Sequence, residues 1–280
     1  MNLSNLLPEA QKTSKTVERL GIVSYTNVAP LHWGLEPWRG AEFVRGVPTE
    51  LNWMLLAGEI DLTLISSYEF LRHSDELKAL PDFSISTLGP VYSVMLFHWE
   101  PWNELSGKRV ALTTDSATSV QLLKVLLRES GVEAEFVPME PDLEGMLEKC
   151  DAALLIGDSA LIEAVEPRQI GGRRPLVTDL GEAWYALTRL PFTFAVWASR
   201  KDNPPSDKLI SELRRARETG LGHLAEVAKA EADHLGLSPL VIQRYLNNFR
   251  YYLELPDRDG LSTFAEKSLE KEVEPQFWTL

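Results

Sequence analysis

The chain has 280 residues, 44% of them hydrophobic, which is enough to form the core of one large domain or of two smaller ones. Asp and Glu outnumber Lys and Arg by 41 to 28, so the formal net charge is −13, and nucleic acid and anionic membranes are unsuitable partners. The single cysteine, Cys150, excludes an intrachain disulfide and a metal site built from several cysteines.

Residues 1–18 lack the charged start and the apolar stretch of a secretory signal, and we interpret them as an N-terminal extension. No segment approaches the ~18 consecutive apolar residues that a membrane-spanning helix needs. We therefore expect a cytoplasmic protein that has no membrane partner.

Strands and helices alternate in the first part of the chain. The apolar pattern, with Pro and Gly at helix ends, predicts strands at 19–25, 42–47 and 61–66. Helices are predicted from Pro30, at 48–59 and at 67–74. This order is typical of a parallel sheet with helices on its faces.

Two adjacent β runs at 83–89 and 91–99 interrupt the alternation, which then starts again. The second set is predicted to contain strands at 109–114, 134–140, 151–157 and 192–199, with helices between the first three of these strands. The last third of the chain is predicted to be helical throughout, at 206–220, 221–236, 238–253 and 260–273.

Two α/β units joined by two long β runs predict a two-lobed protein. The chain would pass to the second lobe at about 91–99 and return at about 192–199. Lobe one is expected at 19–98 plus 194–280, and lobe two at 99–193. Two crossings form a hinge, and the cleft between the lobes is the expected ligand site.

Small polar residues follow the predicted strands, where ligands bind in open α/β sheets. Hydroxyls and free N–H groups at helix N-termini bind carboxylate or phosphate, so they can hold an anion in an acidic protein. Each residue taken alone, Asp158 included, is more simply a helix cap or a turn. Asn27 is the best single candidate, because its amide offers both a donor and an acceptor. The clusters lie at 24–27, 66–67, 92–93, 113–119 and 157–159.

Motifs for other chemistry are missing from the sequence. The five histidines do not have metal-ligand spacing, and HExxH, GxSxG, P-loop and GxGxxG patterns do not occur. This argues against metalloprotease, hydrolase, nucleotide and dinucleotide chemistry. The residues alone predict a two-lobed protein that binds a small anion.

Seven motifs carry a resemblance to a known family. From about Leu20 to the C-terminus, the sequence resembles the chorismate dehydratase family of the futalosine route to menaquinone, which has the two-lobed type II periplasmic-binding-protein fold. One departure is TNV at 26–28, where the family more often reads Leu-Asn-Thr or Leu-Asn-Ser. The motifs are VSYTNVAPL at 23–31, GEIDLTLIS at 58–66, GPVYSV at 89–94, DSATS at 115–119, LIGDSAL at 155–161, DLGEAW at 179–184 and LPFTFAVW at 190–197.

The resemblance implies that chorismate, a dianion, is converted to 3-[(1-carboxyvinyl)oxy]benzoate and water. The formation of an aromatic ring supplies much of the driving force. The resemblance therefore implies that the reaction requires no metal or redox cofactor. Asn27 is the expected catalytic residue, and the substrate's own enolpyruvyl carboxylate is the expected base. The expected substrate-binding residues are Ser24, Tyr25, Ser66, Ser93, Thr118, Ser119 and Asp158.

Three alternatives stay open. A carboxylate-binding protein without catalysis has the same fold, and so does the ligand-sensing domain of a LysR-type regulator. The sister 1,4-dihydroxy-6-naphthoate synthase family opens instead with a Ser-Pro-Cys-Pro-Asn-Asp type loop, and SYTN at 24–27 favours the dehydratase. The sequence does not predict the oligomeric state.

Overall fold

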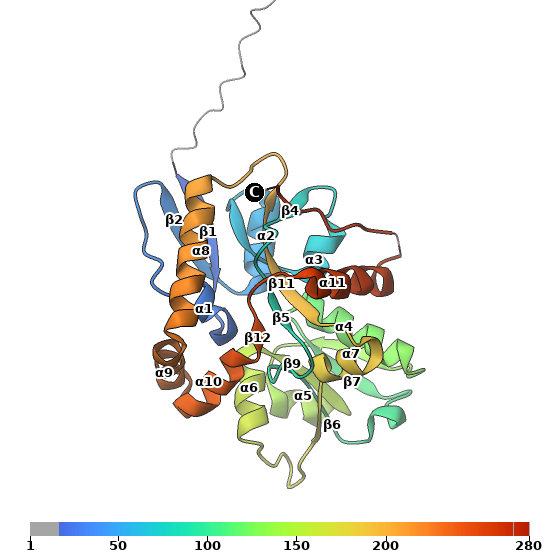
Figure 1. Cartoon of the computed structure of the whole chain (residues 1–280). Coiled ribbons are helices and arrows are strands. Elements are labelled where there is room, and N and C mark those ends of the chain that lie inside the picture. The colour runs from blue at the N-terminus through green and yellow to red at the C-terminus, as the bar shows by residue number, and fades with distance from the viewer. Residues whose placement is uncertain (1–16, 271, 280) are drawn as a thin grey trace, which may run out of the picture.

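A computed structural model describes residues 17–270 and 272–279, so nearly all of the expected N-terminal extension lies outside the described residues. Two sheets divide the chain into two lobes, one above the other in Figure 1. We call the part that carries the first sheet lobe one and the part that carries the second sheet lobe two. Within the described part of the chain, none of the helices has the length and apolar character needed to cross a membrane.

The sheet of lobe one has the strand order β12-β5-β11-β3-β1-β2, with β4 paired to β11. β1 is parallel to β2 and β3, whereas β11 is antiparallel to β3, β4 and β5. All five residues of β3 are buried, as a strand covered on both faces requires. The strands are β1 (Glu18–Val23), β2 (Ala41–Gly46), β3 (Leu62–Ser66), β4 (Leu77–Ala79), β5 (Ile85–Thr87), β11 (Phe192–Arg200) and β12 (Phe249–Arg250).

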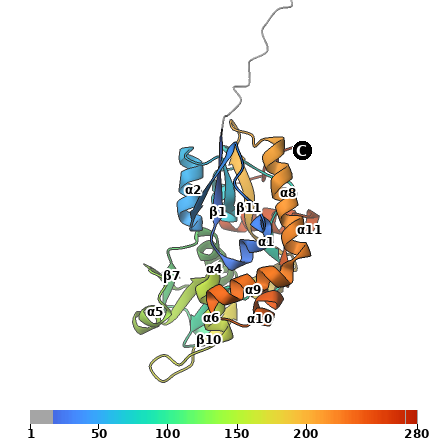
Figure 2. The ribbon, with the colours of Figure 1, turned by 90° about the vertical axis from the view of Figure 1, so that its left-hand side faces the viewer.

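Helices cover both faces of this sheet. Figure 2 shows α2 on one side of β1 and β11, with α1 and α8 on the other. The helices of lobe one are η1 (Thr26–Val28), α1 (Ala29–His32), α2 (Pro48–Ala57), α3 (Ser67–Arg72), α8 (Asp207–Gly222), α9 (Leu224–Leu235), α10 (Pro239–Asn247) and α11 (Leu255–Ser268).

Lobe two has the strand order β10-β6-β9-β7-β8. β7 is parallel to β8 and β9, while β6 is antiparallel to β9 and β10. Its elements are β6 (Val94–His98), η2 (Trp102–Glu104), β7 (Arg109–Thr113), α4 (Ala117–Glu129), β8 (Glu135–Met139), α5 (Leu143–Lys149), β9 (Ala152–Ile156), α6 (Gly157–Val165), β10 (Leu176–Asp179) and α7 (Leu180–Thr188).

The chain changes sheets between β5 and β6 and again between β10 and β11. Both changes come before the expected boundaries at 98/99 and 193/194. Lobe two therefore includes the second of the two adjacent β runs.

The prediction that the last third is helical throughout is wrong at one place. The helix expected at 238–253 ends at Asn247, and Phe249–Arg250 forms β12 against β5. Phe249, Tyr251 and Leu253 are buried, whereas the residues between them are more exposed. Burial of alternate side chains is the pattern of a strand, and here it overrides the helical periodicity.

Candidate functional site: a pocket between the lobes

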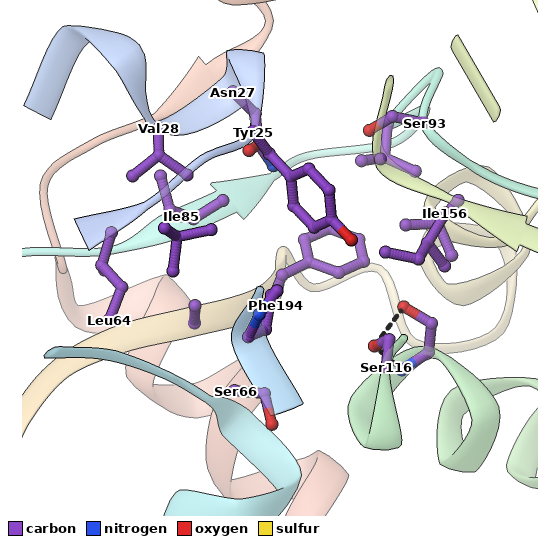
Figure 3. Close-up of a pocket in the computed structure, with 17 residues that line it drawn as sticks. Tyr25, Asn27, Val28, Leu64, Ser66, Ile85, Ser93, Ser116, Ile156 and Phe194 are labelled. Carbon is purple, nitrogen blue, oxygen red and sulfur yellow. Dashed lines mark hydrogen bonds between the residues drawn. The ribbon is translucent and has the colours of Figure 1, made fainter. Parts of the chain in front are cut away.

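A pocket of about 600 Å³, counting its open mouth, lies between the lobes. Figure 3 shows the labelled side chains arranged around this space, with Tyr25 projecting into it. The volume suits a small organic ligand. The lining residues are Val23, Tyr25, Asn27, Val28, Pro48, Leu64, Ser66, Ile85, Val91, Ser93, Val94, Ser116, Ser119, Ile156, Gly157, Phe194 and Ala195.

The loop after β1 supplies Tyr25 and Asn27 to the lining, and Thr26 between them is buried. The Thr26 N–H donates to Asp158 Oδ1 of lobe two at 3.1 Å, and Thr26 Oγ1 donates to Glu231 Oε2 of α9 at 3.1 Å. The Asp158 and Glu231 carboxylates thus hold the loop through Thr26. These bonds fix the positions of Tyr25 and Asn27 in the lining.

Asn27 is the unusual member of the lining. Its Oδ1 is buried and has no hydrogen-bond partner among the described residues. Leaving a buried acceptor unpaired costs about 1–3 kcal/mol, and such atoms are rare in folded proteins. Asn27 is also among the residues that line the pocket, so this unpaired acceptor lies at the site.

The hydroxyls of Ser66 and Ser93 are each held by a neighbour. Ser66 Oγ accepts from Asn52 Nδ2 at 3.2 Å, and Ser93 Oγ accepts from the Tyr245 hydroxyl at 2.8 Å. Burial raises the pKa of Tyr245, so its phenol remains a donor. A serine hydroxyl has a single proton, and these two oxygens already act as acceptors. Each hydroxyl is therefore left to donate its proton into the pocket.

The N-terminus of α4 adds a third hydroxyl of this kind. Ser116 Oγ accepts the Ser119 N–H at 3.1 Å and caps the helix. Ser116 Oγ also donates to Ser119 Oγ at 3.1 Å, the bond that Figure 3 draws as a dashed line. Ser119 thus receives a hydrogen bond and keeps its own proton for a ligand.

Three helix N-termini add positive partial charge beside the pocket. None of the described residues that line it is charged. The lining does include Pro48 and Gly157, the first residues of α2 and α6, and Ser116, the N-cap of α4. The positive ends of helix dipoles favour anions. Gly157 has φ of 65°, and a Cβ there would lie 3.1 Å from the Tyr25 ring, so glycine allows α6 to approach this closely.

The rest of the lining is apolar and fits the body of a ring. The apolar side chains are Val23, Val28, Pro48, Leu64, Ile85, Val91, Val94, Ile156, Phe194 and Ala195. The polar groups are few and lie at strand and helix ends. The pocket therefore suits an apolar ring that carries anionic groups.

The structure brings five of the eight expected site residues into the lining. These are Tyr25, Asn27, Ser66, Ser93 and Ser119.

The other three lie outside the lining. Ser24 is exposed, Asp158 accepts from Thr26, and Thr118 Oγ1 accepts the Tyr68 N–H of α3 at 2.8 Å. Asp158 and Thr118 therefore contact the elements that carry the pocket.

Several site residues were not selected from the sequence. Ser116 and Gly157 belong to the strand-end clusters but were not chosen from them. Asn52, the partner of Ser66, interrupts the apolar run LNWMLL, and this polar residue at a buried helix position was the available signal. The sequence carries no signal for the apolar lining residues, because hydrophobicity does not show which buried side chains border a cavity.

Four carboxyl groups near the pocket have a raised pKa, and in Asp179 the cause is burial, which its hydrogen bonds from backbone N–H groups partly oppose. Burial raises the pKa of Asp158, which the hydrogen bonds from Thr26 partly oppose. Burial and then the nearby Asp158 charge raise the pKa of Glu231, and burial and then Glu140 raise that of Asp115. Among residues 17–270 and 272–279, no group of three or more His, Cys, Asp or Glu is placed to hold a metal ion.

The fold is that of the two-lobed binding proteins. A protein from Archaeoglobus fulgidus matches with a TM-score of 0.71 at 21% identity, over 91% of this chain and 97% of that one. The periplasmic aliphatic sulphonate-binding protein from Escherichia coli matches with a TM-score of 0.65 at 16% identity, over 95% of this chain and 93% of that one. The chain thus has the periplasmic-binding-protein fold, with a hydroxyl-rich pocket between the lobes.

Sequence comparison gives the family. Residues 18–270 match the family described as menaquinone biosynthesis. A chorismate dehydratase from Thermus thermophilus is 51% identical over 259 residues, which cover 88% of this chain and 93% of that protein. The chain belongs to the chorismate dehydratase family of menaquinone biosynthesis, which confirms the resemblance found in its motifs.

Proposed function

We propose that the pocket between the lobes binds chorismate and dehydrates it to 3-[(1-carboxyvinyl)oxy]benzoate and water, as the family membership indicates. The observation that carries the proposal is the buried Asn27 Oδ1, which has no partner among residues 17–270 and 272–279 and lies at a pocket whose serine hydroxyls are set to donate. We also expect the enzyme to act in the cytoplasm, where a biosynthetic route takes its substrate.

The hydrogen-bonding groups of the pocket complement those of the substrate. Dianionic chorismate has two carboxylates, and its ring hydroxyl is its one hydrogen-bond donor. Asn27 Oδ1 needs a donor and is matched by that hydroxyl, which leaves in the reaction. Ser66, Ser93 and Ser119 offer donors and are matched by the carboxylates.

The mechanism needs a base, which we assign to the substrate. The described residues that line the pocket include neither a carboxylate nor an imidazole. Burial, and then Asp115 and Asp158, raise the pKa of the Tyr25 phenol, so it does not provide a phenolate. The enolpyruvyl carboxylate therefore takes the proton from the ring carbon that carries the ether. The C–O bond between the adjacent ring carbon and its hydroxyl group breaks.

The proton and the expelled hydroxide together form water, and the ring becomes aromatic. The protein's contribution is to fix the reactive pose and to exclude solvent. Asn27 orients the departing hydroxyl, and the serine donors with the helix N-termini hold the two carboxylates.

Asp158 and Thr118 support the pocket without lining it. Asp158 holds the loop of Tyr25 and Asn27 through Thr26. Thr118 ties α4 to the first turn of α3 through the Tyr68 N–H. Both links join an element of lobe two to an element of lobe one.

Incubation of the protein with chorismate, followed by chromatography, tests the proposal. The expected result is loss of chorismate with formation of one aromatic product. Chorismate that binds, by calorimetry, but is recovered unchanged would indicate a carboxylate-binding protein instead. Chorismate that neither binds nor reacts would reject the assignment of the pocket.

A further inference from the structure

We propose that Asp179 is a positioning residue for the reaction, which acts by holding the crossing segment (residues 87–93) so that Ser93 meets the substrate. This inference rests on the proposed function. It gives a role to the motif DLGEAW at 179–184, whose side chains are absent from the pocket lining.

The Asp179 carboxylate accepts more hydrogen bonds than a helix cap requires. As the N-cap of α7, its Oδ1 accepts the N–H groups of Gly181 at 2.8 Å and Glu182 at 3.1 Å. Oδ2 of the same carboxylate accepts the Tyr92 N–H at 2.7 Å, and the Val91 N–H is shared between Oδ2 at 2.9 Å and Oδ1 at 3.0 Å. The two further bonds join the start of α7 to the crossing segment.

The crossing segment needs such a clamp because of its backbone conformation. Tyr92 has φ of 62°, a left-handed conformation that is costly for a residue with a bulky side chain. Such conformations persist where the surrounding structure fixes them. The turn places Val91 and Ser93 in the pocket lining and leaves Tyr92 outside it, 38% exposed.

Close packing adds to the clamp. A Cβ on Gly181 would lie 2.6 Å from the Gly89 carbonyl oxygen, so the first turn of α7 lies directly against the segment. Thr87 Oγ1 donates to the same carbonyl at 3.1 Å, and Asn248 Nδ2 donates to the Pro90 carbonyl. Among these partners, Asp179 is the charged one.

Ser93 is held at the other end of the segment. Its carbonyl accepts the N–H of Gly157, the first residue of α6, at 2.8 Å, and its Oγ accepts from the Tyr245 hydroxyl. Because Ser93 directly follows Tyr92 in the chain, a shift at Val91 and Tyr92 would strain these bonds and move a hydroxyl that donates to the substrate. Positioning errors of this kind reduce turnover even when the reacting groups are intact.

The test is Asp179→Asn, measured by steady-state kinetics with chorismate. The amide keeps the size of the side chain, but its NH₂ group cannot accept the N–H groups that the second carboxylate oxygen accepts. We expect kcat/KM to fall about 10- to 100-fold, as for the loss of a hydrogen bond to a charged group. Asp142→Asn is the matched control, because Asp142 caps α5 through the Gly145 N–H and does not line the pocket. It should leave kcat/KM unchanged.

A double-mutant cycle separates positioning from a general loss of structure. If Asp179 acts through Ser93, Asp179→Asn combined with Ser93→Ala will be no slower than Ser93→Ala alone. Effects that multiply would overturn the inference, and so would wild-type kinetics for Asp179→Asn.

A second variant covers the case in which Asp179→Asn does not fold. Gly181→Ala places a methyl group against the Gly89 carbonyl, moves the same segment and leaves the carboxylate intact. We expect the same loss and the same non-additivity with Ser93→Ala, and wild-type kinetics would again overturn the inference. The proposed function is judged separately, because it fails if the wild-type protein yields no aromatic product.

Discussion

Replacement of Asn27 by alanine should make the ligand-free protein more stable and the enzyme much slower. In the wild type, Oδ1 is buried without a partner among the described residues, at a cost of about 1–3 kcal/mol. Alanine removes that acceptor and loses the packing of one partly buried side chain, worth about 1 kcal/mol. We therefore expect the free energy of unfolding to rise by about 1 kcal/mol.

The same change removes the acceptor for the departing hydroxyl. The lost hydrogen bond and the lost orientation together should lower kcat/KM about 100-fold. Stability is measured by urea denaturation without substrate, and turnover by chromatography of the aromatic product. We expect Asn27→Ala to raise the free energy of unfolding and to lower kcat/KM. Within the described part of the ligand-free protein, Asn27 Oδ1 has no hydrogen-bond donor, but it accepts from the substrate hydroxyl in the complex.

Asn247→Ala is the matched control for Asn27→Ala. Asn247 is exposed on α10, and its amide donates only to the Gln243 carbonyl among the contacts of the described chain. This variant should change neither turnover nor stability by more than about 0.5 kcal/mol. If Asn27→Ala instead destabilised the protein by more than 1 kcal/mol and turned over like the wild type, our account of the pocket would be refuted.

Three further predictions concern buried polar and titratable groups. Tyr245→Phe frees the Ser93 hydroxyl and should lower kcat/KM about tenfold, whereas Tyr251→Phe removes a hydroxyl that has no partner within the described part of the chain and should not. Equal kinetics for the two variants would contradict this. Burial raises the pKa of Glu231, so its contribution to stability is full below its ordinary pKa and is lost as the pH rises through the raised value. In urea denaturation, Glu231→Gln should therefore be at least as stable as the wild type at pH 7, with a smaller advantage at pH 4. Burial, and then Arg45, lower the pKa of His32 to about 4, so its contribution is full above pH 6.5 and is lost as the pH falls towards 4. Between pH 7 and pH 4.5 the wild type should lose about 2 kcal/mol more than His32→Asn, and parallel pH profiles would show that His32 is not buried in its neutral form.

Much of the fold could be predicted because strands and helices here have apolar patterns bounded by Pro and Gly. Pro48 begins α2, and the buried run LTLIS forms β3 as expected. Residues 249–253 were wrongly assigned to a helix, because FRYYL has both a helical and an alternating pattern. Only its pairing with β5 decides between them.

The sequence predicted where the site lies better than it predicted which side chains line the pocket. Asn27 follows β1, Ser66 ends β3 and Ser93 precedes β6, and these strand ends meet at the pocket between the two sheets. Thr118 and Ser119 are neighbours on α4, where consecutive side chains face different directions. The structure directs Thr118 toward α3 and Ser119 toward the pocket, which the sequence could not show. The substrate itself came from the family resemblance and not from any single residue.

The lack of a cation among the described lining residues has a consequence for how the enzyme meets its substrate. With a net charge of −13, the protein surface repels a dianion at long range, while hydroxyls and helix ends attract it only over short distances. Dissolved ions screen the repulsion, with a Debye length of about 8 Å at 0.15 M, and scarcely affect the short contacts. Substrate capture should thus become faster as ionic strength rises, the reverse of what an arginine-lined site would show.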